Sequence, residues 1–334
     1  MSHTRITRRA VLSAVPALAI AALARPARAG APSGVTSRVV RSSSDARGVT
    51  LTLELEHAPF PAPGSWHRDP TVLVFVPHHF RPSRDGGVAM VVHFHGHNTT
   101  AERAIAAHQL REQLHDSKQN AILVVPELAV MAPDSSCGKL EAPNGFARLL
   151  GDVVRTLGTK DVRATLGRAA LPEGANIGRV CVSAHSGGYH AAASALKHGG
   201  LVVREVYLFD ALYAEVDVFR DWVVEGRGRP MSARHKLVSY YTGGTTANNT
   251  QRLFAELEQA GVVCAHERVE GTLSREELTR AEAVAIKTQL SHGAVTSELN
   301  GLRDCLYASA LRRHLRSSWF DTKTGARPLE RRRR

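Results

Sequence analysis

Residues 180–193 read VCVSAHSGGYHAAA. An apolar run ends in a tight turn of the pattern small-x-Ser-x-Gly, with Ser186 at its centre, and an alanine-rich stretch follows. The pattern predicts a buried strand, a sharp turn and a helix. Such a turn strains the backbone of its central residue and lifts the hydroxyl of Ser186 off the sheet. Strand and helix nearly touch there, so Ala184 and Gly188 must be small. The alternative is an ordinary glycine-rich turn.

Apolar runs alternate with helical patterns along most of the chain. The expected strands cover residues 49–56, 71–77, 88–94, 121–125, 179–183, 203–209, 237–241 and 262–269, and the expected helices cover 101–116, 144–157, 187–197, 250–259, 274–290 and 297–316. Strands that alternate with helices predict an α/β protein with a doubly wound, mostly parallel sheet flanked by helices. Sites in such sheets form beyond the carboxyl ends of the strands.

Three further features accompany the turn at Ser186. A His-Gly turn follows an apolar run in VVHFHGHN, residues 91–98; Asp210 directly follows Tyr-Leu-Phe; and His292 stands in a late Ser-His-Gly loop. With these features the chain resembles the α/β-hydrolase family, and in particular its serine esterases and lipases, over about residues 49–316. The order Ser, Asp, His is the one that this family uses.

The resemblance implies a role for each of these residues. Ser186 would be the nucleophile, His292 the general base and acid, and Asp210 the carboxylate that orients the imidazole. The backbone N–H groups of Gly187 and His97 would form the oxyanion hole. The implied reaction is acyl transfer to water through an acyl-enzyme, with no metal and no organic cofactor.

Rival residues exist for the acid and the base. Many family members carry the acid after the strand at 237–241, but the following loop, residues 242–250, contains no Asp or Glu. Asp217 is the weaker alternative acid, and Asp210 itself could instead cap a helix that begins at Ala211. His185 and His266 are expected to be structural, because one precedes the nucleophile and the other lies in an apolar strand.

A metal site is the competing interpretation of the His-Gly turn. His93, His95 and His97 alternate, so on an extended strand they would share one face and could hold zinc. Asn98 stands where common metallohydrolase signatures carry an Asp, and a metal site leaves the turn at Ser186 unexplained. We therefore expect no metal ligands here.

The substrate is less well defined by the sequence. An ester is the default, whereas an amide or peptide bond served by the same triad is the main alternative. A secreted binding protein on an inactive hydrolase scaffold is an alternative of another class. The segment 131–140 follows a predicted strand at the same sheet edge, where Asp134 and Lys139 could contact a small-molecule or polymer substrate. A surface loop is equally consistent, and the sequence identifies neither substrate-binding residues nor the oligomeric state.

The two ends of the chain differ from its body. Residues 1–29 resemble a twin-arginine export signal, with Arg8 and Arg9 before an uncharged apolar stretch and a small-x-small cleavage site before Gly30. We expect a flexible lead-in at 30–48, a hydrolase domain at 49–320 and a basic tail at 321–334. The export machinery would be a partner, and the mature protein would be periplasmic or secreted.

The formal net charge of +12 does not indicate a nucleic-acid partner. Residues 1–29 hold five arginines and no acid, and the chain ends in the run Arg331–Arg334, so much of the charge lies outside the folded body. Four cysteines are too few for a disulfide framework. Cys181 and Cys264 are expected to be buried thiols. A disulfide between Cys137 and Cys305 is an open alternative in an oxidising compartment.

Overall fold

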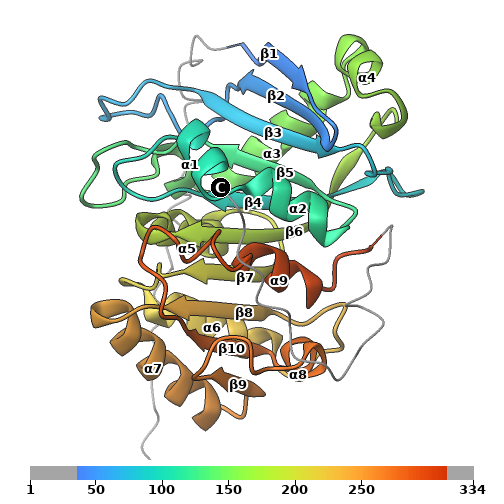
Figure 1. The fold of residues 1–334 in the computed structure, drawn as a ribbon. Helices are drawn as coiled ribbons and strands as arrows, with labels where there is room; N and C mark the ends of the chain where they lie inside the picture. Colours follow the sequence, from blue (N-terminus) through green and yellow to red (C-terminus); the bar gives the residue numbers. More distant parts are fainter. Residues whose placement is uncertain (1–35, 314–334) are drawn as a thin grey trace, which may run out of the picture. The chain divides into compact units, whose positions relative to one another are not determined.

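The computed structural model describes residues 36–313, which fold around a single sheet (Figure 1). The strands of this part of the chain are β1 (Arg38–Ser44), β2 (Gly48–Glu54), β3 (Thr71–Pro77), β4 (Gly87–Phe94), β5 (Ile122–Pro126), β6 (Asn176–His185), β7 (Val203–Phe209), β8 (Lys236–Tyr241), β9 (Cys264–Glu267) and β10 (Ala283–Lys287). Their order in the sheet is β1-β2-β3-β5-β4-β6-β7-β8-β10-β9.

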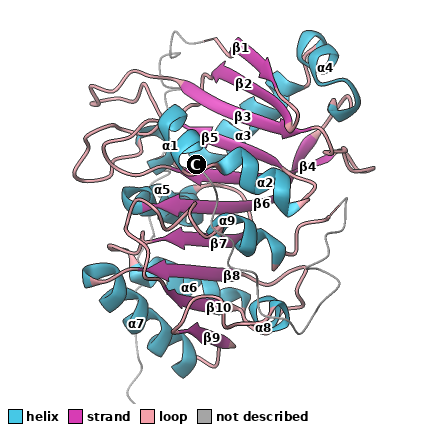
Figure 2. Cartoon of the chain, viewed as in Figure 1, coloured by secondary structure: helices cyan, strands magenta, loops and turns pink. Residues whose placement is uncertain are grey.

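Helices connect most of the strands (Figure 2). The α-helices are α1 (Ala101–Ala107), α2 (Leu110–Ser117), α3 (Gly145–Leu157), α4 (Lys160–Leu166), α5 (Tyr189–His198), α6 (Val216–Gly226), α7 (Gly244–Gln259), α8 (Arg275–Arg280) and α9 (Gly301–Tyr307). Short 3₁₀ turns add η1 (Gly138–Glu141), η2 (Gly167–Ala169) and η3 (Ser186–Gly188). No helix among the described residues has both the length and the apolar character needed to cross a membrane.

The sheet is antiparallel at one edge and parallel elsewhere. β1, β2, β3 and β5 pair antiparallel, whereas every pair from β5 through β4 to β9 is parallel. Parallel neighbours require crossover connections, which the intervening helices provide. The predicted α/β fold with a doubly wound, mostly parallel sheet is confirmed.

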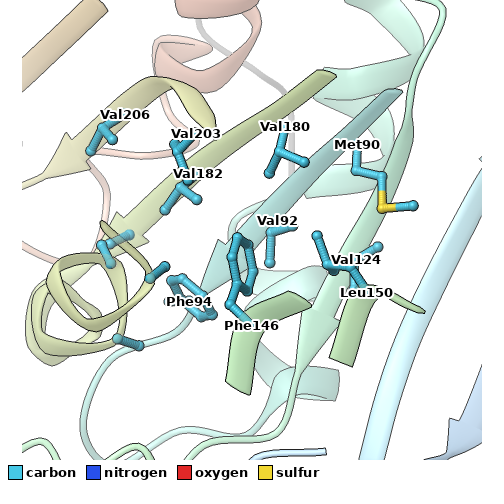
Figure 3. Close-up of a cluster of buried hydrophobic side chains, with 14 of the residues drawn as sticks. Met90, Val92, Phe94, Val124, Phe146, Leu150, Val180, Val182, Val203 and Val206 are labelled. Carbon is cyan, nitrogen blue, oxygen red and sulfur yellow. The ribbon is translucent and has the colours of Figure 1, made fainter. Parts of the chain in front are cut away.

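Successive side chains of the central strands point to opposite faces of the sheet, and they fill a hydrophobic core on each face. On β6, Val180 and Val182 pack into one core while Cys181 points into the other. Figure 3 shows the first core, where Phe94 and Phe146 approach each other with ring centroids 6.0 Å apart. Helices α3, α5, α6 and α7 cover this face, and α1, α2, α8 and α9 cover the other. Both faces of the parallel strands are therefore buried, which explains their nearly continuous apolar sequences.

Several predicted elements need correction. Arg38–Ser44, placed in the flexible lead-in, form the edge strand β1. The single helix expected at 101–116 is two helices, because Gln109 adopts a left-handed conformation with φ 47°. The helix expected at 274–290 is the short α8 followed by β10. The predicted export signal at 1–29 and the tail at 321–334 lie outside the described residues.

Candidate active site

The turn at Ser186 has the geometry that its sequence predicts. β6 ends at His185, η3 begins at Ser186 with φ 53°, and α5 follows from Tyr189. A left-handed φ strains any residue with a side chain, and such strain is typical of functional sites. A Cβ at Gly188 would lie 2.3 Å from the Phe94 carbonyl oxygen, so strand and helix leave no room for one.

Asp210 and His292 lie together beside this turn. Asp210 follows β7 at the carboxyl edge of the sheet, and its Oδ2 is 2.7 Å from Nδ1 of His292. His185, the residue before Ser186, donates from Nε2 to the His292 carbonyl oxygen at 2.8 Å, and the two imidazole rings are 4.6 Å apart. An ionised Asp210 carboxylate accepts the N–H of His292 Nδ1, which leaves Nε2 as the basic nitrogen of this imidazole.

The residues that follow β8 donate hydrogen bonds to Asp210, the acid that follows β7. Thr242 donates its backbone N–H to Asp210 Oδ1 at 3.0 Å and its hydroxyl to Oδ2 at 2.8 Å, and the Thr246 hydroxyl donates to Oδ1. Burial alone would raise the pKa of Asp210. Hydrogen bonds from His292, Thr246 and Thr242 outweigh burial and lower the pKa to about 2. Asp210 is therefore an ionised carboxylate, and both of its oxygens accept hydrogen bonds.

The two alternatives for Asp210 do not fit the structure. Asp217 is an exposed residue of α6 that pairs with Arg220 and Arg252, each at 3.0 Å. No helix begins at Ala211, since the next helix starts at Val216, so Asp210 is not a helix cap. Among the carboxylates considered from the sequence, Asp210 is the one that the fold brings to His292.

The His-Gly turn runs directly against the turn at Ser186. A Cβ at Gly96 would lie 2.7 Å from the Cβ of Ser186, so this position requires glycine. A Cβ at Gly187 would be 3.4 Å from the backbone nitrogen of His97. The structure thus brings Gly187 and His97 side by side next to Ser186, where two backbone N–H groups could stabilise an oxyanion.

Buried histidines account for the His-rich stretch. His93 is fully buried and lies 2.7 Å through Nδ1 from the Ser183 hydroxyl. His95 donates from Nδ1 to the Gly96 carbonyl at 2.9 Å and accepts from Leu128 N–H through Nε2 at 2.8 Å. His97 is exposed. Both ring nitrogens of His95 are therefore occupied by the backbone, and the structure does not gather the three imidazoles into a metal-binding group of the described residues.

The segment 131–140 lines a cavity. This cavity has a volume of about 720 Å³, within the range of small-molecule sites, and its other wall carries the exposed Trp66. Ser135 links it to the candidate site, because its Oγ would lie 2.9 Å from a Cβ at Gly187. Asp134 and Lys139 line the cavity, and Lys139 also donates to the Glu56 carbonyl at 2.7 Å.

Some residues at the site carry no recognisable sequence signal. Thr242 directly follows β8 and Thr246 is in the first turn of α7, within the stretch 242–250 that is notable in the sequence only because it lacks an acid. Tyr189 hydrogen-bonds Ser135, and Tyr213 meets the His292 ring edge-on with centroids 6.4 Å apart. Hydroxyl side chains are common in loops, so only the fold shows which of them reach Asp210 and Ser135.

The cysteines form no bridge in the structure. All four are free thiols, and Cys137 and Cys305 are both buried. The bridge considered between Cys137 and Cys305 is therefore absent. Cys181 is buried as expected, whereas Cys264 is only half-buried.

No family model and no curated protein matches the sequence. Solved structures similar to this chain include an S-formylglutathione hydrolase from Agrobacterium tumefaciens, with 13% identity over 82% of this chain and 100% of that one and a TM-score of 0.45. A mutant feruloyl esterase module from Clostridium thermocellum complexed with sinapinate has 8% identity over 84% and 92% of the two chains and a TM-score of 0.44. MGS-M1, an α/β-hydrolase enzyme from a deep-sea metagenome library, has 12% identity over 76% and 82% and a TM-score of 0.34. These neighbours are hydrolases of similar architecture.

Proposed function

We propose that this protein is a serine hydrolase that cleaves a carboxylic ester. The observation that carries the proposal is the 2.7 Å pair of Asp210 and His292 beside the strained serine of the turn. A serine hydroxyl needs such a base to become a nucleophile at neutral pH. The exposed side of the pair is open to substrate, since 42% of the His292 side chain is exposed.

The proposed reaction has two halves. Nε2 of His292 accepts the Ser186 proton as Oγ attacks the carbonyl carbon, and the N–H groups of Gly187 and His97 bind the resulting oxyanion. The ester C–O bond then breaks, and the His292 proton passes to the leaving alcohol. Water, deprotonated by the same imidazole, releases the acid and restores Ser186. Asp210 stays ionised throughout and stabilises the imidazolium.

The cavity beside Ser135 is the proposed place for the bulkier part of the substrate. Its exposed apolar side chains, Trp66 and Met131, are suited to an aromatic or aliphatic group, and Asp134 and Lys139 add polar contacts. An amide substrate would use the same triad, and its cleavage depends on how well the leaving amine is protonated.

A fluorophosphonate probe tests the nucleophile. Parent protein should be labelled at one site and hydrolyse esters from a panel of matched esters and amides. Ser186→Ala should stay folded and lose both labelling and turnover. The control Ser183→Ala alters the buried serine bonded to His93 and should keep both. Labelling that survives Ser186→Ala would refute the assignment. Absence of both labelling and turnover in the folded parent would favour a binding protein, and faster amide cleavage would favour an amidase.

Export is proposed from the first 29 residues. The twin-arginine pair at Arg8 and Arg9 is what that export system reads, so Arg8→Lys combined with Arg9→Lys should trap a longer precursor in the cytoplasm. The exported protein should begin at Gly30. An exported form that begins at Met1 would refute a cleaved signal.

A further inference from the structure

Three metal-ligating side chains outside the proposed triad converge beside the turn at Ser186. The Cys137 sulfur, a carboxylate oxygen of Glu141 and a ring nitrogen of His190 all lie within 4.8 Å of one another. Cys137 directly precedes η1, and Glu141 is the last residue of η1. His190 is in the first turn of α5. None of the three is used in the proposed hydrolysis.

His190 is oriented as a metal ligand is. Its Nδ1 is 3.2 Å from Glu215 Oε2, while its Nε2 is 3.5 Å from Glu141 Oε1. Histidines that bind zinc usually donate their other ring N–H to a carboxylate, which fixes the tautomer. Ligand atoms at zinc–nitrogen and zinc–oxygen distances of about 2.0–2.2 Å and a tetrahedral angle are about 3.4 Å apart. The separation of Nε2 and Oε1 thus already fits one tetrahedral edge.

A hydrogen bond also holds Cys137 and Glu141 together. Glu141 Oε1 accepts the backbone N–H of Cys137 at 2.8 Å, which holds the carboxylate close to the thiol. The Cys137 side chain is buried and lies 3.6 Å from the Ser194 hydroxyl. Burial raises the pKa of this thiol well above its ordinary value, so the free site holds a proton that a metal would displace.

The cluster is open to solvent on one side. The Cys137 sulfur forms its buried floor, whereas the Glu141 and His190 side chains are 45% and 27% exposed. A cation can therefore reach the sulfur past the side chains of Glu141 and His190. Two carboxylates and one potential thiolate surround the imidazole, so the local charge favours a divalent cation.

We propose that Cys137, Glu141 and His190 bind one Zn²⁺, with water as the fourth ligand and Glu215 holding His190 in place. A set of sulfur, nitrogen and oxygen ligands suits zinc better than magnesium or calcium, which prefer oxygen alone. Binding forms a zinc–sulfur bond and releases the thiol proton to solvent, with no change of oxidation state.

The proposed zinc would join two parts of the fold. Gly138, Lys139 and Glu141 line the cavity beside Ser135, and α5 leads directly from the turn at Ser186. A metal between η1 and α5 would therefore fasten one wall of the cavity to the helix of the turn. None of its ligands takes part in the chemical steps of the proposed hydrolysis.

Zinc titration of the chelator-treated, dialysed full-length protein tests the site. Calorimetry at pH 7.5 should give one equivalent bound, and the Co²⁺ form should show a near-ultraviolet thiolate band. Cys137→Ser and His190→Gln should each weaken zinc binding by at least tenfold and remove or alter this band, and Glu215→Gln should weaken binding about 10–100-fold. Ser186→Ala should bind zinc like the parent, which separates this proposal from the proposed hydrolysis.

Matched controls come from β9. Cys264→Ser and His266→Gln remove a half-buried thiol and an imidazole that contacts Glu258, and both should keep zinc binding unchanged. If Cys137→Ser does not fold, the Co²⁺ spectrum of the parent tests for the thiolate ligand, and the zinc titration of His190→Gln tests for the imidazole ligand. Absence of stoichiometric binding in the parent, binding unaffected by His190→Gln, or equal losses in the β9 variants would overturn the proposal.

Discussion

Asp210 Oδ2 and His292 Nδ1 lie 2.7 Å apart although 82 residues separate them in the sequence. β7 delivers the aspartate and the loop after β10 delivers the histidine, both at the carboxyl edge of the sheet. Thr242 and Thr246, from the end of β8 and the start of α7, complete the hydrogen bonds of the carboxylate. Three segments distant in sequence therefore position one imidazole.

Asp210→Asn tests this relationship. The amide keeps the size of the side chain but loses its charge, and it can present N–H to Nδ1, which favours the wrong tautomer of His292. We expect turnover to fall on the order of 10⁴-fold, as in the best-studied triad. Steady-state kinetics on an ester measures the loss. Asp217→Asn is the control, and it should change little because Asp217 pairs only with surface arginines. The opposite result would move the acid to Asp217.

The sequence indicates a residue of the candidate site where a local pattern of residue types marks it. The turn around Ser186 combines small residues with an apolar run before it, and Asp210 ends an apolar strand. Such local features are visible without the fold. Thr242 and Thr246 are different, because a threonine after a strand or at the start of a helix has many possible partners, and only the placement of β7 beside β8 selects Asp210.

Predictions of the elements fail where local preference and tertiary packing disagree. Ala283–Lys287 read AVAIK and follow a charged helical stretch, so the sequence favours one long helix. In the fold these residues form β10, which pairs on both sides with β8 and β9 and is buried on both faces. Tertiary packing overrides a weak helical preference here. β1 is missed for the opposite reason, since its residues are largely exposed and only pairing with β2 defines it.

Gly96→Ala tests the close contact between the two turns. A Cβ would lie 2.7 Å from Ser186 Cβ and 3.1 Å from the His185 carbonyl oxygen, so the turn must move and carry the His97 N–H away. We expect a hundredfold or greater loss of turnover, the typical cost of losing one oxyanion donor. Steady-state kinetics measures the loss of turnover, and thermal unfolding measures the effect of the moved turn on stability.

Gly151→Ala is the matched control for this substitution. Gly151 lies inside α3 with no atom within 4 Å of an added Cβ. Alanine there should leave turnover unchanged and stabilise the protein by about 1 kcal/mol, because it favours the helix. Full activity of Gly96→Ala would show that the His-Gly turn does not contribute an oxyanion donor.

Trp66→Ala tests the cavity as the substrate site. Trp66 is 70% exposed and contributes little to folding, so the variant should fold normally. For esters with an aromatic or long aliphatic group we expect KM to rise roughly tenfold with kcat unchanged, which corresponds to about 1.4 kcal/mol of lost binding. Acetyl esters of a small alcohol should be hydrolysed as by the parent. Val202→Ala removes another exposed apolar side chain, outside the cavity, as a control. Equal kinetics of parent and Trp66→Ala on every ester would place the substrate elsewhere.

The buried histidines predict loss of stability in acid. Burial lowers the pKa of His108 to about 3 and that of His185 to about 4, whereas the same groups in an unfolded chain titrate near 6.5. The unfolded chain therefore binds more protons as pH falls below about 6.5. Their contribution to stability is complete above that pH and is lost progressively as pH falls toward about 3.

His108→Gln isolates one of these groups. Glutamine stays neutral, so the dependence of the unfolding free energy on pH between about 6 and 4 should be shallower than in the parent by about 1.4 kcal/mol per pH unit, the effect of one proton. Denaturant unfolding at several pH values measures this slope, which a uniform loss of packing would leave unchanged. His78→Gln replaces an exposed histidine and should keep the slope of the parent. Equal slopes for parent and His108→Gln would show that His108 takes up its proton without unfolding, and burial of His108 would then not be a source of acid sensitivity.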